Sequence, residues 1–328
     1  MSSTASQVGP ATTPAHMMCV PLTVFRLHEA HNLDLYIWQE GDEEPTLYCS
    51  ADVALTATDL QRLAERGHRS LYVTRHAYAD LNDQLNQSLG SILSDPSLAV
   101  EERMAVLQTA LALEVDSTFQ LINCDRFVAL SQRLATQIND LLADSPVVPR
   151  KLFEILRHDF YTFTHVTNVA MYATLLSDEL GWNDREVREQ ITVGGLLHDL
   201  GKKFVPASVL CKPGKLNEAE WRLIKAHPQR GYEELCERDN LNFGQLMMVY
   251  SHHERIDGGG YPVGLLGEDI HDWAKLTAIV DVFEALTGAR PYRSALKLSE
   301  ALEYIERNAG TQFDTEMARC WISLMRQR

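Results

Sequence analysis

The residues best suited to chemistry in this chain lie in its second half, where imidazole and carboxylate side chains recur within a helical pattern. The most compact group is His198-Asp199-Leu200-Gly201-Lys202, which closes a stretch with helical hydrophobic spacing. A histidine and an aspartate side by side at a helix end can turn toward one cation, and the glycine lets the chain bend away without a Cβ clash. Taken alone the dipeptide is a weak signal, because His158-Asp159 is a second one that lacks the Gly-Lys continuation.

Further ligand-type side chains favour a metal centre around this pair. A lone histidine on an apolar helix face is most often a core group with a satisfied hydrogen bond, but five histidines and two aspartates in one helical region favour ligation. Imidazole together with carboxylate suits iron, manganese, zinc or nickel, whereas oxygen ligands alone would indicate magnesium or calcium. The candidate metal ligands are His165, His198, Asp199, His227, His252, His253 and Asp281.

Two later stretches carry groups that suit a phosphate or a nucleobase. In the segment 257–262 (Asp-Gly-Gly-Gly-Tyr-Pro), three glycines allow the backbone to approach a ligand closely, and the proline stiffens the exit. The arginines around Pro291-Tyr292 offer fork-shaped donors for phosphate. By composition alone, a flexible surface turn and a solvated loop are the plainer interpretations. The candidate substrate-binding residues are Gly258, Gly260, Tyr261, Pro262, Arg290 and Arg293.

The order of these motifs resembles the HD superfamily of metal-dependent phosphohydrolases and, in detail, its HD-GYP subfamily. The matching pieces are His165, His198–Lys202, Lys212–Leu216, His227-Pro228, His252–Pro262, Asp281 and Arg290–Arg293. The resemblance covers about residues 150–320. It implies an α-helical bundle that hydrolyses the bacterial second messenger cyclic di-GMP to linear pGpG, with onward hydrolysis to GMP left open. It implies nothing firm about residues 1–145.

The resemblance also implies how the ligands divide between two divalent metal ions, with iron or manganese as the preferred metals. One ion would take His165, His198, Asp199 and Asp281, and the other Asp199, His227, His252 and His253. Two cations about 3.5–4 Å apart can share a hydroxide, lower its pKa toward neutrality and hold both oxygens of an in-line displacement at phosphorus. Asp199 and Lys202 are then the catalytic residues, with Lys202 neutralising a phosphate oxygen or assisting the leaving group.

One position departs from the family pattern. Some members carry a glutamate one helical turn before the first histidine, where it helps to hold a third metal, and this chain has Tyr161 there. A phenol does not bridge cations as a carboxylate does, so we expect two metals. Glu254 and Glu284 are the available replacements, and we favour roles for both that face solvent or support a ligand.

These residues need a scaffold, and the hydrophobic spacing predicts that it is mainly helical. The pattern predicts helices over 78–95, 100–119 and 121–144, another around His165 up to Gly181, and one from Asn183 to the His198 motif. Strand-like runs at 20–25, 33–38, 46–49 and 70–73 enclose a helix at 56–66. The expected fold class is mainly α, with a C-terminal HD-type α-helical bundle and a small N-terminal α+β module.

The expected domain boundaries follow from these changes in pattern. Residues 1–17 are small, polar and proline-bearing, which predicts a flexible tail. Residues 18–77 form the small α+β module, to which we assign a regulatory role. Residues 78–149 form a helical linker, and residues 150–328 form the HD-GYP phosphohydrolase domain. The long linker helices leave open a homodimer, although no clean heptad is present.

Charge and composition exclude several classes of function. With 30 Lys and Arg against 45 Asp and Glu, the formal net charge is −15, which disfavours a protein that coats DNA. No apolar run is long enough for a transmembrane helix, the first residues lack the pattern of a signal peptide, and the six cysteines are scattered. We therefore expect a cytoplasmic protein with no DNA partner and no membrane insertion. Its expected partner is cyclic di-GMP, with signalling proteins as an open possibility.

Two alternatives stay open at this point. The same metal centre would attack phosphorus in another cyclic dinucleotide or in a nucleotide, and only the resemblance of the Gly-Tyr-Pro loop favours cyclic di-GMP. The second alternative is a non-catalytic cyclic di-GMP receptor. The intact set of ligands argues against it, because a protein that only binds the messenger does not need a pair of metals.

Overall fold

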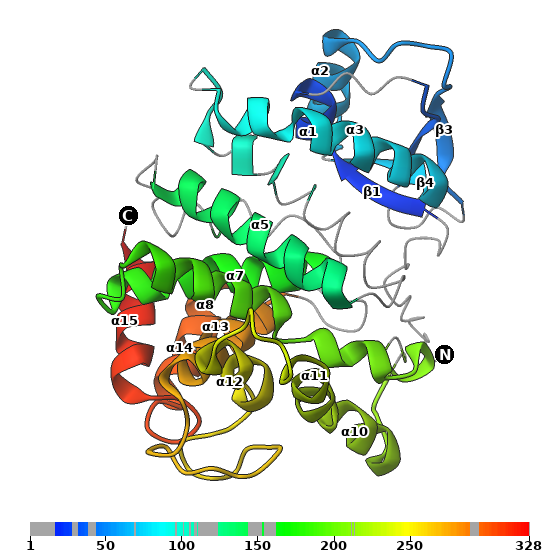
Figure 1. The fold of residues 1–328 in the computed structure, drawn as a ribbon. Coiled ribbons are helices and arrows are strands. Elements are labelled where there is room, and N and C mark those ends of the chain that lie inside the picture. Colours follow the sequence, from blue (N-terminus) through cyan, green and yellow to red (C-terminus); the bar gives the residue numbers. More distant parts are fainter. Residues whose placement is uncertain are drawn as a thin grey trace, which may run out of the picture. The chain divides into compact units, whose positions relative to one another are not determined.

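The chain divides into two compact units in a computed structural model, the first reaching to Leu113 and the second beginning at Glu114. Figure 1 shows their helices and strands. The expected fold class, mainly α with a small α+β module near the N-terminus, is confirmed. The structure describes residues 17–27, 32–38, 44–68, 70–95, 97–100, 102–104, 106–107, 110, 124–143, 153, 162–210, 212, 214–288 and 295–327. The predicted tail lies outside these residues except for its last position.

The first unit contains an antiparallel sheet with the strand order β1-β4-β2-β3. Its elements are β1 (Met17–Pro21), α1 (Leu22–Leu27), β2 (Leu35–Ile37), β3 (Thr46–Cys49), α2 (Ala57–Glu65), β4 (Ser70–Thr74) and α3 (Arg75–Leu93). The strand predicted over 20–25 is wrong beyond Pro21. Leu22, Val24 and Phe25 are all buried, and two consecutive buried side chains fit a helical turn better than the alternating faces of a strand.

The second unit is a bundle of α-helices that carries the predicted metal ligands. Its helices are α5 (Cys124–Ala143), α7 (Thr162–Glu179), α8 (Arg185–Leu197), α9 (Ala207–Leu210), α10 (Glu218–Lys225), α11 (His227–Leu235), α12 (Phe243–Ser251), α13 (Asp272–Thr287), α14 (Leu298–Arg307) and α15 (Thr315–Arg326), with the 3-10 helix η1 (Leu200–Phe204). Helix α8 packs against α5, α7 and α12, and α13 packs against α7, α12 and α15. The rings of Tyr172, Phe283 and Trp321 meet in this core, with centroids 4.9–5.6 Å apart.

The helices of the site begin and end where local sequence dictates. Helix α8 begins after Asp184, whose carboxylate accepts hydrogen bonds from two amides of the first turn, so the cap predicted at Asn183 is wrong by one residue. Helix α12 begins with a capping box at Asn242 and ends at Ser251, which leaves His252 as its C-terminal cap. Several ligand-type residues therefore lie at helix ends, where the chain changes direction.

The part of residues 78–149 that the structure describes contains helices, as predicted. The helix predicted over 78–95 corresponds to α3, and the one over 121–144 corresponds to α5. Of the helix predicted over 100–119, residues 102–104, 106–107 and 110 are helical, and residues 111–119 lie outside the described part of the chain. Among the described residues, no helix combines the length and the apolar character needed to cross a membrane.

Candidate metal centre

Three elements of the bundle bring the first group of predicted ligands together. His165 comes from α7, His198 and Asp199 lie between α8 and η1, and Asp281 comes from α13. The Nε2 of His165 lies 3.1 Å from Asp281 Oδ1 and 3.4 Å from Asp199 Oδ2. The Nε2 of His198 lies 3.5 Å from the same Asp199 oxygen and 3.9 Å from Asp281 Oδ1. Two imidazole nitrogens and two carboxylates thus face one small volume.

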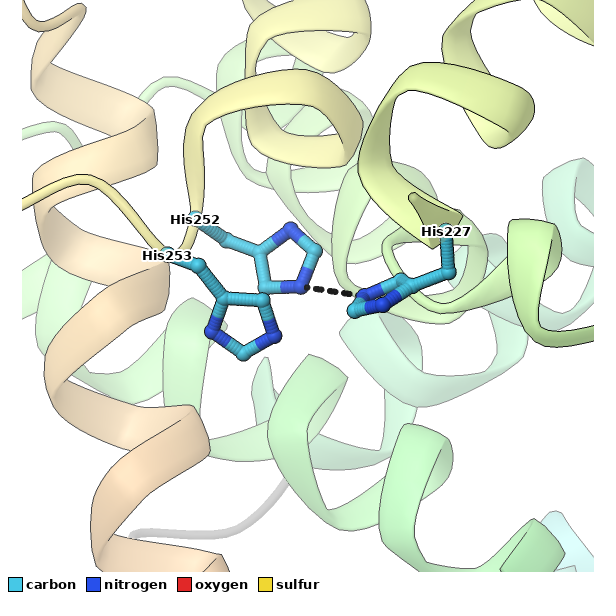
Figure 2. A group of neighbouring side chains, drawn as sticks. All are labelled: His227, His252 and His253. Carbon is cyan, nitrogen blue, oxygen red and sulfur yellow. Dashed lines mark hydrogen bonds between the residues drawn. The ribbon is translucent and has the colours of Figure 1, made fainter. Parts of the chain in front are cut away.

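A second group consists of three histidines from α11 and the end of α12. His227 opens α11, and His252 and His253 follow α12 directly. Figure 2 shows the three imidazole rings close together. The Nε2 atoms of His227 and His252 are 3.2 Å apart. The Oδ1 of Asp199 lies 3.2 Å from His227 Nε2 and 3.9 Å from His252 Nε2. Asp199 therefore faces the first group with one oxygen and the second group with the other.

The backbone fixes which nitrogen several of these rings present. In three histidines, Nδ1 lies within hydrogen-bond distance of a carbonyl oxygen one turn earlier in the chain, so Nε2 is the nitrogen that points into the site. These contacts join His198 to Gly195 (2.7 Å), His227 to Ile224 (2.7 Å), and His252 to Met248 and Val249 (3.0 Å each).

His165 is held instead by a side chain from another helix. Its Nδ1 forms a close hydrogen bond with Glu284 Oε2, and the amide of Asn168 donates to Glu284 Oε1 at 3.3 Å. Glu284 lies three residues after Asp281 on α13, so the two carboxylates are neighbours on one helix face. Helix α13 thereby contacts both nitrogens of His165.

Buried polar atoms of both groups fit a cation. His165 Nε2 and His198 Nε2 in the first group, and Asp199 Oδ1, which faces the second group, are buried and form no hydrogen bond of proper geometry. Buried polar atoms in proteins are normally paired, and each one left unpaired costs free energy. Atoms that converge in this way, from residues that all ligate divalent metals, are explained if a metal ion is their partner.

The charge states of these residues also suit metal binding. Burial lowers the pKa of His198, lowers that of His252 well below its ordinary value and lowers that of His253 to about 3, so these imidazoles are neutral. Burial alone would raise the pKa of Asp199 and Asp281. Neighbouring cationic groups outweigh it, chiefly Lys202 for Asp199 and His165 for Asp281, so both pKa values are lowered and both carboxylates are ionised.

His165 differs from the other histidines in its protonation. Burial lowers its pKa, but the charge of Glu284 and the contacts with Asp199 and Asp281 outweigh burial and raise the pKa well above the ordinary value. Three carboxylates around one imidazole stabilise its protonated form. His165 must therefore lose its Nε2 proton to act as a ligand, so that metal binding at this position releases a proton.

Lys202 and Gly201 connect the first group to the second. The ammonium of Lys202 bonds Asp199 Oδ2, and its side chain is partly exposed. A Cβ on Gly201 would lie 1.9 Å from the carbonyl oxygen of His227 and 2.7 Å from the amide nitrogen of Gly231. Only glycine allows η1 and α11 to approach this closely. The glycine of the His-Asp-Leu-Gly-Lys motif thus sets the distance between Asp199 and His227.

The glycine-rich loop lies beside the second group. Gly258 has a φ of +76°, and a Cβ on Gly260 would lie 2.5 Å from the Cα of Glu254. The ring of Tyr261, followed by Pro262, packs on His253 with centroids 4.7 Å apart and planes inclined by 32°. Burial, followed by the charges of the nearby aspartates, raises the pKa of Tyr261, so its phenol is neutral and can donate a hydrogen bond.

Three predicted positions cannot be placed, and other residues emerge from the structure. Arg290, Arg293 and Tyr161 lie outside the described residues. Lys225 and Asn168 had no role in the sequence analysis. The ammonium of Lys225 lies 5.3 Å from the Tyr261 ring centroid, and Asn168 supports Glu284. The signals for these two residues were weak: Lys225 precedes His227 by two residues, and Asn168 follows His165 by three.

The second unit, which contains the candidate ligands, is similar in sequence to known proteins. Residues 136–317 match the family model described as HD domain. The chain is 39% identical over 206 residues to the cyclic di-GMP phosphodiesterase response regulator RpfG of Xanthomonas campestris pv. campestris. This alignment covers 62% of this chain and 53% of that protein. The chain is also 40% identical over 157 residues to 3'3'-cGAMP-specific phosphodiesterase 3 of Vibrio cholerae serotype O1. This second alignment covers 48% of this chain and 34% of that protein. The chain thus spans about half the length of the first relative and about a third of the second.

A solved structure shares the fold over nearly the whole chain. Bd1817, an HDG"Y"P protein from Bdellovibrio bacteriovorus, superposes with a TM-score of 0.66 at 16% identity. The alignment covers 95% of this chain and 100% of that chain. At this level of identity the likeness is one of fold.

Proposed function

This chain belongs to the HD domain family, as an HD-GYP protein, and we propose that it is a metal-dependent phosphodiesterase that hydrolyses cyclic di-GMP to linear pGpG. The observation that carries the proposal is the position of Asp199, whose two carboxylate oxygens face two different groups of imidazole nitrogens. A carboxylate shared in this way suits a pair of cations, which is a common arrangement in enzymes that cleave phosphodiesters.

We assign the ligands to two sets that share Asp199. His165, His198 and Asp281 complete one set, and His227, His252 and His253 complete the other. Divalent cations bound in these sets would polarise the phosphoryl oxygens and lower the pKa of a bound water. We propose iron or manganese for both positions, because both are among the metals that suit imidazole mixed with carboxylate and the resemblance favours them.

The remaining residues of the site would bind and orient the dinucleotide. The partly exposed ammonium of Lys202 lies beside Asp199, where it can neutralise a phosphate oxygen or assist the leaving group. Tyr261 offers an aromatic face beside His253 for a guanine base. Arg290 and Arg293 stay predicted phosphate contacts. Further hydrolysis of pGpG to GMP would require the linear product to rebind in the same place.

A second candidate substrate is 3'3'-cGAMP, which is favoured by the name of the relative from Vibrio cholerae. The two cyclic dinucleotides differ in one base and share the phosphodiester linkages that a metal pair would attack. Discrimination between them must therefore come from residues that contact the bases. The loop that contains Tyr261 is the candidate for that contact.

The test is turnover by the metal-loaded protein. We expect the protein, loaded with manganese or ferrous iron under anaerobic conditions, to convert cyclic di-GMP to pGpG. Chromatography of the products measures the conversion, and a parallel reaction contains 3'3'-cGAMP. Asp199→Asn removes the shared carboxylate and should lower the rate at least about a hundredfold. The control is Asp272→Asn, because Asp272 is an exposed carboxylate at the start of α13. An inactive wild type, or an active Asp199→Asn variant, would contradict the proposal.

A further inference from the structure

A buried carboxylate connects the end of α12 to the glycine-rich loop. Glu254 follows His253 directly and is 3% exposed. Its oxygens accept hydrogen bonds from the backbone amides of three consecutive residues: Val263 at 2.7 Å, Gly264 at 3.0 and 3.1 Å, and Leu265 at 3.1 Å. Consecutive amides that converge on a carboxylate stabilise its negative charge. Glu254 thus binds the far end of the loop to the segment that carries His252 and His253.

The same loop returns to this segment at a second point. The amide of Tyr261 donates to the carbonyl oxygen of His253 at 3.2 Å. At Gly260 the backbone approaches Glu254 and Arg255 so closely that a Cβ would lie 2.5 Å from atoms of both residues. These contacts leave the Tyr261 ring packed on His253. The position of Tyr261 therefore depends on how the loop is attached to residues 253–255.

Two large hydrophobic side chains of this segment contribute little to the attachment. Val263 is 57% exposed and Leu266 is 54% exposed, although both are large hydrophobic residues of the loop. The free energy gained from burying apolar surface is proportional to the area removed from water, so these side chains stabilise the loop weakly. The bonds to the buried Glu254 carboxylate contribute more than these two exposed side chains, because hydrogen bonds to a charged group are stronger than neutral ones.

We infer that Glu254 is a positioning residue for substrate, which holds the loop 258–265 so that Tyr261 stays beside His253 and can contact the dinucleotide. The inference rests on the proposed function. Glu254 accepts hydrogen bonds from the amides of residues 263–265, which begin two positions after Tyr261, and the ring of Tyr261 packs on His253. We therefore expect Glu254 to determine substrate affinity, with the metal ions bound normally and the chemical step little changed.

The test compares Glu254→Gln with Glu268→Gln, which changes an exposed carboxylate just beyond the loop. Glutamine keeps the shape of the side chain but turns an amide donor toward the backbone donors of residues 263–265. We expect faster hydrogen exchange over 258–266 in Glu254→Gln, unchanged metal content, a KM for cyclic di-GMP raised about tenfold and a kcat within about threefold of wild type. Glu268→Gln should match wild type in all four measurements.

A second variant keeps the inference testable if Glu254→Gln does not fold. Gly264 has a φ of +83°, and a Cβ there would lie 3.1 Å from the carbonyl oxygen of Gly258, so Gly264→Ala should loosen the loop and raise KM while Glu254 stays in place. Faster exchange with unchanged KM would overturn the inference, and so would loss of metal. If wild type turns over no dinucleotide, the proposed function fails, and the dissociation constant of cyclic di-GMP from calorimetry replaces KM in the same comparison.

Discussion

The contact between Glu284 and His165 shows how one side chain controls the chemistry of another. The Nδ1 of His165 bonds Glu284, so only its Nε2 faces Asp199 and Asp281. Carboxylates that bond the outer nitrogen of a ligating histidine fix the orientation of the ring and increase its basicity. Glu284 and His165 lie 119 positions apart in the chain. The residue types were evident from the sequence, but this pairing required the fold.

Because Glu284 holds His165, we expect Glu284→Ala to weaken metal binding about 10–100-fold. Glu284→Gln should have a smaller effect, because its amide oxygen can still accept a hydrogen bond from the Nδ1–H of His165. Competition titrations with a chromophoric chelator measure both affinities. Glu306→Ala, which removes an exposed carboxylate from α14, is the control. Equal affinities in Glu284→Ala and wild type would exclude this role for Glu284.

Among the secondary-structure elements, the close contact between η1 and α11 determines the geometry of the site. Gly201 lies against the backbone of His227 and Gly231, and Asp199 and His227 lie beside this contact. Because both neighbouring atoms belong to the backbone, they cannot move aside as a flexible side chain would. The two elements would have to separate to admit a larger residue.

Gly201→Ala is therefore expected to destabilise the protein by about 2–3 kcal/mol and to reduce metal content. The matched control is Gly90→Ala in α3, where a Cβ would meet nothing within 4 Å and the added helix propensity should stabilise by up to about 1 kcal/mol. Calorimetric unfolding of both variants gives the comparison. A Gly201→Ala variant with the unfolding midpoint and metal content of wild type would show that the elements can adjust.

Local sequence predicts the long helices of both units well and the ends of elements less well. The hydrophobic repeats of α3 and α5 were sufficient, because both helices bury one face along their length. The predicted cap of α8 was one residue too early, because Asn183 and Asp184 are both good capping residues. The strand expected over 20–25 is a helix beyond Pro21, because tertiary burial overrides the strand propensity of short apolar segments.

The site was predictable in its residue types and not in its internal contacts. Resemblance to a family identified the candidate ligands, and the bundle brings all seven together. The sharing of Asp199 between the two groups was implied by the resemblance alone, because it depends on the angle between helices, which no local pattern encodes. The bonds of Glu254 also depend on how the loop folds back. The assignment of ligands to particular metals stays a prediction.

For the molecule as a whole, the chain is acidic and the substrate that we propose is an anion. The formal net charge of −15 repels a dinucleotide at long range. Bound cations would make the site locally positive, and the ammonium groups of Lys202 and Lys225 lie near it. Affinity for an anion is therefore expected to depend on metal loading more than on the overall charge.

The buried imidazoles also predict how the stability of the metal-free protein depends on pH. His198, His252 and His253 have lowered pKa values because of burial, so they stay neutral in the folded chain. In the unfolded chain they take up protons below about pH 6.5, which lowers the free energy of unfolding as the pH falls. The pKa of His165 is raised, so this residue has the opposite effect on the pH dependence. It accounts for one proton, whereas the three neutral histidines account for three.

We therefore expect the thermal unfolding midpoint of the metal-free protein to decrease as the pH is lowered from 7.5 to 5.5. The measurement is a thermal melt in chelator, at an ionic strength that screens the surface charges. Addition of manganese to 100 times its dissociation constant should restore about 2.7 kcal/mol for each site filled. A midpoint that is constant or rises as the pH falls would show that the imidazoles are not neutral in the folded state.

The run His252-His253-Glu254 has a consequence for how this protein can change over generations. Two of these residues belong to the histidine group, and the third holds the loop. Their side chains take different directions because α12 ends immediately before them. Three adjacent codons therefore specify part of the candidate cation site and the attachment of the loop. Loss or duplication of one codon here would disturb both at once.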